Sequence, residues 1–326
     1  MGGVEAVDSR TASPANGSSS GSGAGGQAQR ARRKDPRRAV LERGAAVIFL
    51  LPTLVLVGIF SYYPAIRAGV TAFTHWDGFN PPTWVGLQNF TDAFTDPAFR
   101  KSVVNVAIWT AFGVPLAMIP SFIVAELIYR LRSDRAQYFW RAVFVAPMIL
   151  PPVVMVLIWQ FLFGMDGPIN VVLRKVGLGE YTHYWIGEPK FALAALIVLG
   201  FPWVNAFNVL IFYAGLKAIP GEIIEAAAME GAGRWRQLIH IELPLTGGQW
   251  KLLLVLSIIG VTQNLLVPLL LTDGGPGNAT VTPVLYMYQR AINYGQYGFG
   301  MAVGTMLFVV VLVLSIVNMR FLRTSN

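Results

Sequence analysis

The chain has 326 residues, of which 54% are hydrophobic and 13% are charged, whereas soluble domains carry roughly a quarter charged residues. This balance, with a mean hydropathy of +0.54, indicates a protein of the lipid bilayer rather than a soluble domain. The net charge of +8 does not indicate nucleic-acid binding, because the basic residues lie between apolar runs and near the N-terminus, and the absence of cysteine excludes disulfides and thiol catalysis.

Residues 1–44 precede the first long apolar stretch and comprise two parts. The first part, 1–29, is rich in Gly, Ser and Ala and is expected to be disordered, because it has too little apolar surface to bury. The segment from Arg30 to Arg43 is strongly basic. It is expected either to bind anionic lipid headgroups or to act as a topology signal that holds the N-terminus in the cytoplasm, and the second reading is favoured.

Six apolar stretches follow, each close to the ~20 residues that cross the hydrocarbon core. None has a charged residue in its interior, which matters because an Asp, Lys or Arg at a helix centre costs about 2.5–3.5 kcal/mol on insertion. Prolines within them are tolerated in a membrane bundle. The sequence therefore predicts an all-α, polytopic bundle of six transmembrane helices over residues 45–326, with spans near 45–66, 102–125, 142–164, 191–216, 252–272 and 299–319.

Lys and Arg residues are unevenly distributed between the two sides of these spans. Eighteen of the 25 lie in the N-terminal tail, the 126–141 loop, the 217–251 segment and the C-terminus. Because positive charge is retained inside, both termini and the 217–251 segment are predicted to be cytoplasmic. The external loops are then roughly 67–101, 165–190 and 273–298.

The 217–251 segment carries a spaced pattern of small, acidic and apolar residues. It contains Glu225-Ala-Ala, then three residues, Gly231, nine residues, Ile241, one residue and Leu243-Pro244. Pro220 can start a short helix over Gly221 to Glu230, Gly231-Ala-Gly allows a turn with positive φ, and a second short helix is expected from Arg234 to Glu242. Two short helices at an angle would form a knob that enters a groove on another protein. The alternative is an ordinary hairpin between two spans.

That spacing resembles the EAA loop by which permease subunits of ATP-binding-cassette importers dock onto their ATPase. The resemblance implies that Glu225, Ala226, Ala227 and Gly231 form the contact core, with Ile241, Leu243 and Pro244 completing the motif. The chain has no phosphate-binding Gly-Lys-Ser/Thr loop of its own. It is therefore expected to hold no cofactor, to be no enzyme, and to use ATP that is bound by a partner ATPase.

Other segments are similar to carbohydrate permeases of the maltose and glycerol-phosphate uptake type, and to the first permease of the pair in particular. They are Val85-Gly-Leu-Gln-Asn-Phe90, Asn105, Arg141 to Pro147, Gly167-Pro-Ile-Asn170 and Leu271-Thr-Asp-Gly-Gly-Pro-Gly-Asn-Ala-Thr280. The resemblance implies a sugar substrate, a homologous second permease, an ATPase dimer and an extracytoplasmic solute-binding protein, in the cytoplasmic membrane of a bacterium.

Two alternatives stay open at this point. One is an importer of another small solute, such as a glycerophosphodiester, although spans without Lys or Arg offer no anion site. The other, from a different class, is a membrane scaffold without transport activity. No paired intramembrane carboxylates and no Ser/His arrangement indicate a membrane enzyme.

A sugar pathway needs hydrogen-bonding groups and an aromatic face pointing inward, because polar groups facing lipid are costly. The candidates are Trp203, Asn205, Asn208, Gln263 and Asn264. The alternative is that these amides bridge neighbouring helices. Asn264 is the favoured candidate, since it aligns with a sugar-contacting amide in the maltose importer. The third span offers nothing polar near Met148 and Pro152, so recognition of the sugar is expected mainly from the external binding protein.

Overall fold

A computed structural model of the protein describes residues 49–201 and 204–322. The predicted tail 1–44 and the pathway candidate Trp203 lie outside the described residues. The chain divides into two units, Met1–Ile59 and Phe60–Asn326, and the second holds the helical bundle. The first predicted span is the helix Phe49–Thr71. It contains a π-turn, η1 (Gly58–Tyr62), and then continues beyond residue 66 as α2 (Tyr63–Thr71).

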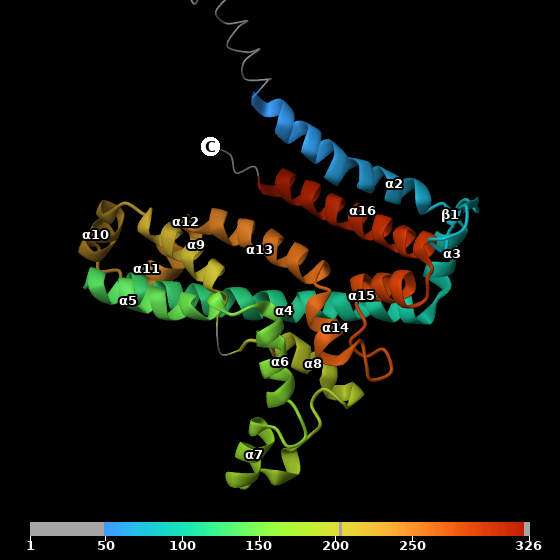
Figure 1. Ribbon diagram of the computed structural model, residues 1–326. Coiled ribbons are helices and arrows are strands. Elements are labelled where there is room, and N and C mark those ends of the chain that lie inside the picture. The colour runs from blue at the N-terminus through green and yellow to red at the C-terminus, as the bar shows by residue number, and fades with distance from the viewer. Residues whose placement is uncertain (1–48, 202–203, 323–326) are drawn as a thin grey trace, which may run out of the picture. The chain divides into compact units, whose positions relative to one another are not determined.

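The central element of the bundle is α4 (Pro97–Tyr129) (Figure 1). It begins where the side chain of Asp96 accepts a hydrogen bond from the Ala98 N–H at 2.7 Å, with Pro97 at the first helical position. Pro115 and Pro120 lie inside the helix without ending it. At 1.5 Å per residue its 33 residues reach about 50 Å. Since the hydrocarbon core is ~30 Å thick, α4 is long enough to cross it and emerge on both sides.

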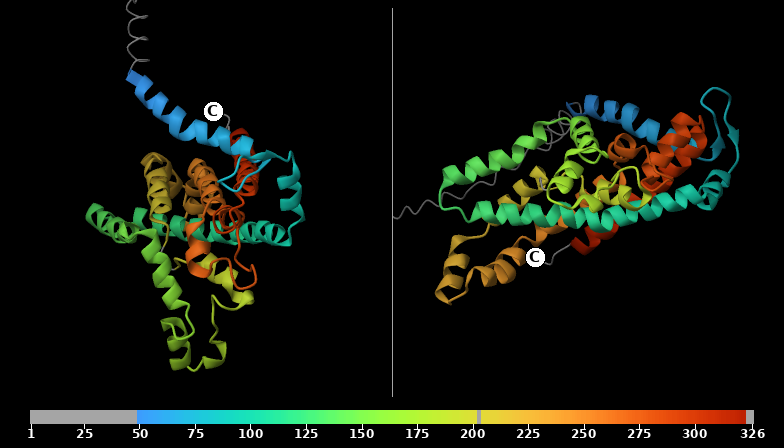
Figure 2. Two further views of the ribbon diagram at one scale, coloured as in Figure 1. Left: turned by 45° about the vertical axis from the view of Figure 1, so that its right-hand side comes forward. Right: turned by 90° about the horizontal axis from the view of Figure 1, so that it is seen from below.

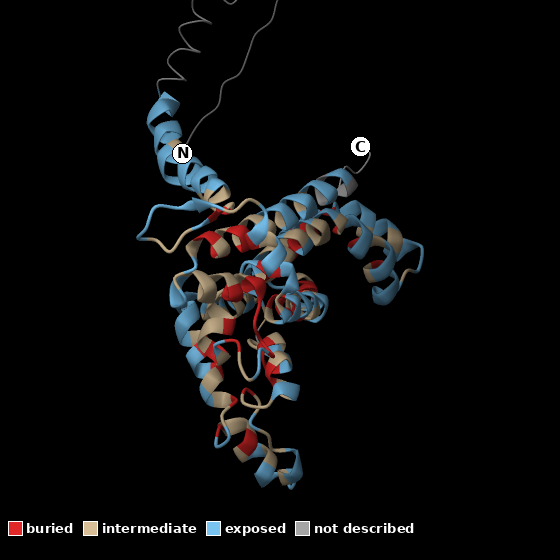
Figure 3. Cartoon of the chain, turned by 90° about the vertical axis from the view of Figure 1, so that its right-hand side faces the viewer, coloured by how far each residue is buried: buried red, intermediate tan, exposed pale blue. Residues whose placement is uncertain are grey.

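Three buried clusters lie along α4, and each joins it to other helices. In the first cluster the partners of α4 are α9 (Ala206–Lys217) and α13 (Gly247–Thr262). In the second they are α6 (Pro152–Leu162), α8 (Pro189–Val198) and α14 (Leu266–Thr272). In the third they are α15 (Pro283–Tyr288) and α16 (Tyr297–Leu322). In the first cluster the rings of Phe122, Phe212 and Trp250 pack with centroids 4.7–5.2 Å apart. Buried residues gather along these contacts, while outward helix faces stay exposed (Figure 3).

Three of the six predicted spans are not continuous helices, which corrects the prediction. The third is α5 (Asp134–Val145) with η2 (Ala146–Ile149), followed by α6 after a bend of 88°. The fourth breaks between α8 and α9, and the fifth between α13 and α14. Long, apolar and uninterrupted helices are found only for the first, second and sixth spans among the described residues.

Each break has a local cause. Pro151 and Pro152 lack backbone N–H groups, so the third span cannot continue its hydrogen-bond ladder there. Gly200 has φ +98, a conformation outside the helical region. In the fifth span the side chain of Asn264 accepts a hydrogen bond from the Val267 N–H at 3.0 Å and so starts a new helix.

Small elements occupy the segments predicted to be external. A two-stranded antiparallel pair, β1 (Thr74–His75) with β2 (Thr83–Trp84), precedes α3 (Gln88–Thr95). Among the described residues, these two short strands are the exception to an otherwise helical fold. The others are α7 (Pro168–Lys175), η3 (Gly179–Tyr181) and η5 (Gln289–Asn293). The hairpin and α3 lie at the Pro97 end of α4 (Figure 2).

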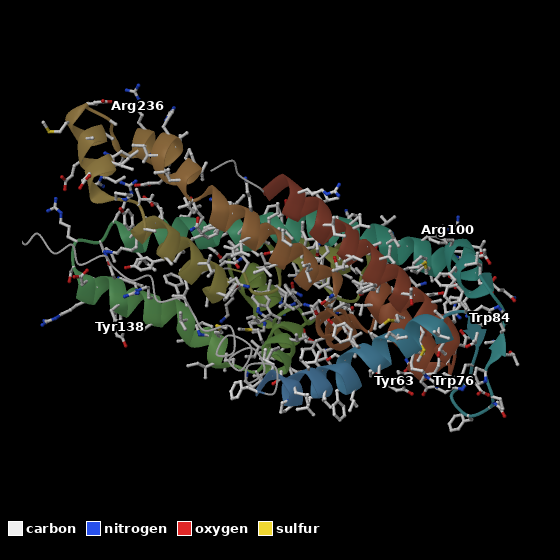
Figure 4. The ribbon with its side chains drawn as sticks, turned by 90° about the horizontal axis from the view of Figure 1, so that it is seen from above. Tyr63, Trp76, Trp84, Arg100, Tyr138 and Arg236 are labelled. Atoms are coloured by element: carbon white, nitrogen blue, oxygen red, sulfur yellow. The ribbon has the colours of Figure 1, made fainter. Side chains whose placement is uncertain are left out.

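The 217–251 segment lies at the other end of α4. It forms α10 (Gly221–Met229), α11 (Arg234–Gln237), η4 (Leu238–Glu242) and α12 (Leu243–Leu245) before α13 begins. Figures 1 and 2 show α10 and α11 at the end of the bundle opposite the hairpin. The labelled side chains of Arg236 and Trp84 mark these two ends in Figure 4. One helix therefore connects the 217–251 segment with the predicted external elements.

Candidate functional site

The helices α10 and α11 meet at a corner built around Gly231. The Gly231 N–H donates to the Ala228 carbonyl at 3.0 Å, and the Ala232 N–H donates to the Ala227 carbonyl at 2.9 Å. This pair of bonds satisfies the last carbonyls of α10 and needs a left-handed residue, and Gly231 has φ +78. A Cβ added at Gly231 would meet nothing within 4 Å. Glycine is therefore required by the backbone conformation rather than by lack of space.

The tip of this corner is exposed and partly apolar. Of the residues in the predicted contact core, Glu225, Ala226 and Gly231 are exposed and Ala227 is half-buried. Beside them Met229 is 89% exposed and Trp235 is 77% exposed, although neither was singled out from the sequence. The signal that could have found them is a large apolar residue within a polar, predicted exposed turn. Neighbouring exposed apolar side chains on a polar turn are a feature of surfaces that another protein covers.

The second half of the 217–251 segment differs from the prediction in where its helix ends. The helix does not stop at Leu243-Pro244 but runs from Arg234 to Leu245, with the π-turn η4 just before Pro244. A π-turn leaves room for a proline, which lacks an N–H for the regular ladder. Ile241 is half-buried, whereas Leu243 and Pro244 are exposed.

A buried charged cluster joins this half of the segment to α4. The Arg130 Nη2 donates to both carboxylate oxygens of Glu242, at 2.9 and 3.1 Å, and the Arg130 Nε donates to Glu126. The side chains of Glu242 and Glu126 are 1% and 8% exposed. Burial, with the nearby Glu126 carboxylate, raises the pKa of Glu242 to about 7 against the opposing effect of Arg130. The sequence offered a hint only in the spacing of Glu126 and Arg130, one turn apart at the end of a span.

The breaks of the three interrupted spans come together around a cavity of about 480 Å³. Pro147 and Met148 line it from the third span, Gly200 and Asn205 from the fourth, and Asn264 from the fifth. On the α4 side the lining residues are Trp109, Gly113, Leu116, Ala117 and Pro120. Irregular backbone at membrane depth is tolerated where it lines a cavity, and discontinuous helices are a recurrent way to build transport sites. Among the described residues that line the cavity, none has a charged side chain.

The structure separates the predicted pathway amides into two groups. Asn205 and Asn264 line the cavity, and each also accepts a hydrogen bond from a backbone N–H at the start of the next helix. Asn205 accepts from the Asn208 N–H at 3.2 Å, and Asn264 accepts from the Val267 N–H at 3.0 Å. Asn208 is buried and donates to the Ala117 carbonyl of α4 at 3.4 Å, so it bridges helices. Gln263 is exposed and is not among the lining residues.

Comparisons with known proteins agree with this architecture. Residues 113–324 match the family described as "Binding-protein-dependent transport system inner membrane component", and the chain belongs to that family. Its members are permeases of transport systems, so the chain is an integral membrane permease and not an enzyme.

Among individual relatives, the chain is 32% identical to the diacetylchitobiose uptake system permease protein NgcF of Streptomyces coelicolor, over 85% of this chain and 83% of that protein. It is 31% identical to a probable ABC transporter permease protein, YesP, of Bacillus subtilis, over 86% and 90%. A solved bacterial ABC transporter involved in alginate import is similar in fold, with a TM-score of 0.75 and 22% identity over 88% of this chain and 98% of that one.

Proposed function

We propose that this protein is one permease subunit of an ATP-driven, binding-protein-dependent sugar importer in the cytoplasmic membrane of a bacterium. It forms half of the translocation pathway beside a homologous second permease. Two copies of an ATPase bind the nucleotide, and an extracytoplasmic solute-binding protein delivers the sugar. Family membership and relatives that take up diacetylchitobiose or arabinooligosaccharides support this assignment.

The observation that carries the proposal is the exposed corner of α10 and α11 at one end of α4. Gly231 presents Glu225 and Ala226 on a preformed turn, and Met229 and Trp235 add exposed apolar surface beside them. In the proposed importer the ATPase hydrolyses the nucleotide, so this permease receives its driving force through contact with that subunit. The corner offers a hydrogen-bonded turn and the apolar surface that such a contact needs. We assign this end of α4, with both chain termini, to the cytoplasm.

The cavity at the three span breaks is the proposed sugar pathway. Sugars are bound by hydrogen-bonding groups together with flat apolar faces, and the lining offers the amides of Asn205 and Asn264 with the ring of Trp109. Among the described lining residues there is no Lys or Arg to hold a phosphate, so nothing favours a glycerophosphodiester over a neutral sugar. The opposite end of α4 would then receive the binding protein, at the hairpin where Phe79 is 94% exposed.

The test is Gly231→Asp, which places a bulky anionic side chain on the corner at the cost of about 1 kcal/mol of backbone strain. Gly177 is a matched control: it ends α7 with φ +82, the same pair of backbone bonds, and open space around an added Cβ. We expect Gly231→Asp to remain in the membrane but to lose copurifying ATPase and uptake of trial sugars such as diacetylchitobiose. Gly177→Asp should keep both. Normal uptake by Gly231→Asp would refute the proposed coupling.

A further inference from the structure

Arg130 holds two buried carboxyl groups at the junction between α4 and the 217–251 segment. Its guanidinium contacts Glu126 on its own helix and Glu242 on η4, and it also reaches the Arg234 carbonyl at 3.5 Å. Residues 130 and 242 are far apart in the chain. The cluster is therefore a tertiary joint that links the corner of α10 and α11 to the long central helix.

The charges in this joint do not balance if every group is ionised. One guanidinium neutralises one carboxylate, and the second would be an uncompensated negative charge with 1% to 8% of its side chain exposed. Burying an unpaired carboxylate costs far more than binding a proton near neutral pH, so such a site takes up a proton instead. Two carboxyl groups on one guanidinium are also close enough to repel each other when both are ionised.

An orphaned atom shows where that proton belongs. The Oε2 of Glu126 is buried and has no hydrogen-bond partner among the described residues. Both carboxyl groups contact the same guanidinium, so a proton on either one would remove their repulsion and could be donated to the unpaired oxygen. We propose that Glu126 and Glu242 share one proton and, with Arg130, form a neutral joint through which the 217–251 segment moves α4.

The joint is well placed for that role. α4 lines the cavity at Trp109, Gly113 and Pro120, which lie about three to six helical turns from Arg130, the residue that caps the end of this continuous helix. A displacement of the α10–α11 corner that the joint carries into α4 would thus reach the cavity directly. Arg130, Glu126 and Glu242 act here as positioning residues, and this step rests on the proposed coupling to an ATPase.

Several other titratable groups lie around the joint. On α4 the neighbour is Tyr129, and Lys217 of α9 lies over its ring with the Nζ 5.9 Å from the centroid. On the 217–251 segment Arg234 contributes its carbonyl, while His240 is exposed and contacts the Arg236 carbonyl. Because burial raises the pKa of Glu242 above its value in the unfolded chain, the joint is complete at low pH and loosens as the pH rises through about 7.

Infrared difference spectroscopy on the purified full chain tests the shared proton directly. We expect a protonated-carboxyl C=O band at pH 6 that disappears toward pH 8 with a midpoint near 7. The band should be lost in Glu242→Gln and in Glu126→Gln, and kept in Glu180→Gln, an exposed glutamate of the predicted external loop. A pH 6 spectrum in which neither substitution at 126 or 242 changes the carboxyl band would overturn the proposal, whatever the function of the chain.

The mechanical role needs the assembled importer, with ATP as the probe. The chain has no cysteine, so introduced cysteines at Ile123 on α4 and Val313 on α16 accept spin labels without background from this subunit. We expect Mg-ATP to change the distance between the labels at pH 6 and to change it less at pH 8. Glu242→Gln, fixed in a neutral form, should keep the full change at pH 8, while Glu126→Gln/Glu242→Gln, which leaves Arg130 unpaired, should lose it at both pH values.

The outcomes separate this inference from the proposed function. If ATP moves the labels in the wild type and Gly231→Asp abolishes that movement, the coupling stands. If, in the same assembly, Glu242→Gln retains the wild-type pH dependence or the double variant moves normally, the joint is refuted while the coupling survives. If ATP moves nothing in an assembly that hydrolyses it, both fail together.

Discussion

At the predicted external segments, three buried asparagines hold loops through uncharged bonds to backbone carbonyls, whereas the 217–251 segment is attached through a charged side-chain cluster. Asn89 donates to the carbonyls of Ala72 and Thr74, and Asn105 donates to those of Asn278 and Val281. Asn170 donates to three carbonyls and accepts from the Trp185 Nε1. No comparable asparagine holds the 217–251 segment among the described residues; Glu126, Arg130 and Glu242 do so instead.

The difference suggests a division of labour between the two regions. An amide that bonds to backbone carbonyls fixes one loop conformation and does not respond to pH or salt near neutrality. Where a guanidinium lies between two carboxyl groups, it can change its partner, and the carboxyl pair can gain or lose a proton. Loops that present a docking surface benefit from the first kind of attachment, and a moving joint needs the second.

The largest effect on stability is expected from removing Asn170. Asn170→Ala leaves the carbonyls of Met165 and His183 and the Trp185 Nε1 without their side-chain partner, whereas the Gly164 carbonyl keeps the Gly167 N–H. Each buried polar group left unpaired costs about 1–3 kcal/mol, so we expect a total loss of roughly 3 kcal/mol or more, even with partial hydration. Thermal unfolding and limited proteolysis within 165–190 measure it.

Asn80→Ala is the matched control, because Asn80 is an exposed amide whose side chain bonds to Asp77 on a loop tip. It should change stability by less than about 0.5 kcal/mol. Equal unfolding temperatures for the two variants would show that Asn170 does not hold its loop, and the contrast between the two regions would lose its main support.

A smaller and more specific effect is expected at the tip of the corner. Trp235→Ala removes a side chain that is 77% exposed, so the stability of the chain itself should stay within about 0.5 kcal/mol. Aromatic side chains often dominate binding at interfaces, and we expect the ATPase to bind about 10-fold more weakly, which corresponds to ~1.4 kcal/mol. Titration of the ATPase onto immobilised chain measures this.

Phe79→Ala removes an aromatic side chain of similar exposure from the opposite end of α4 and serves as the control. It should leave the affinity for the ATPase unchanged. A loss of ATPase binding in both variants, or in Phe79→Ala alone, would contradict the assignment of the two ends.

The sequence predicts the features that depend on neighbouring residues. The turn at Gly231 is one, because its hydrogen bonds join Ala227 to Ala232 within one short stretch. The existence of six apolar stretches is another, because length and composition alone decide it. The roles of the residues on that turn stay predictions until they are tested.

Features that depend on contacts between residues far apart in the chain could not be predicted from the sequence. Prolines give no reliable sign of a broken span, since Pro115 and Pro120 sit inside the continuous α4 while Pro151 and Pro152 mark a bend of 88°. Whether neighbouring helices take up the freed backbone groups decides between these outcomes, and a sequence window contains no such neighbours. The partners Arg130 and Glu242 likewise meet only in the folded chain.

The smallest effect concerns the ion pair between Asp96 and Arg290 at the Pro97 end of α4. Asp96 caps α4, accepts a hydrogen bond from the Tyr286 hydroxyl at 2.7 Å and pairs with Arg290. Burial acts to raise the pKa of Asp96, but the Tyr286 hydroxyl, the Ala98 N–H and Arg290 outweigh it and lower this pKa. A lowered carboxyl pKa gives stability that is present above the unfolded value, 3.8, and is lost as the pH falls through the folded value.

Tyr286→Phe removes only the hydroxyl and should cost about 1 kcal/mol at neutral pH. Because the lost bond favours the ionised carboxyl, the variant should also begin to unfold at a higher pH than the wild type when it is acidified. Asp96 is ionised and has its partners at neutral pH, so the stability of the Pro97 end should not change between pH 6 and 8. The joint at Arg130, in contrast, titrates in that range. Acid unfolding followed by tryptophan fluorescence checks both statements, and a stability change of Tyr286→Phe that varies between pH 6 and 8 would contradict them.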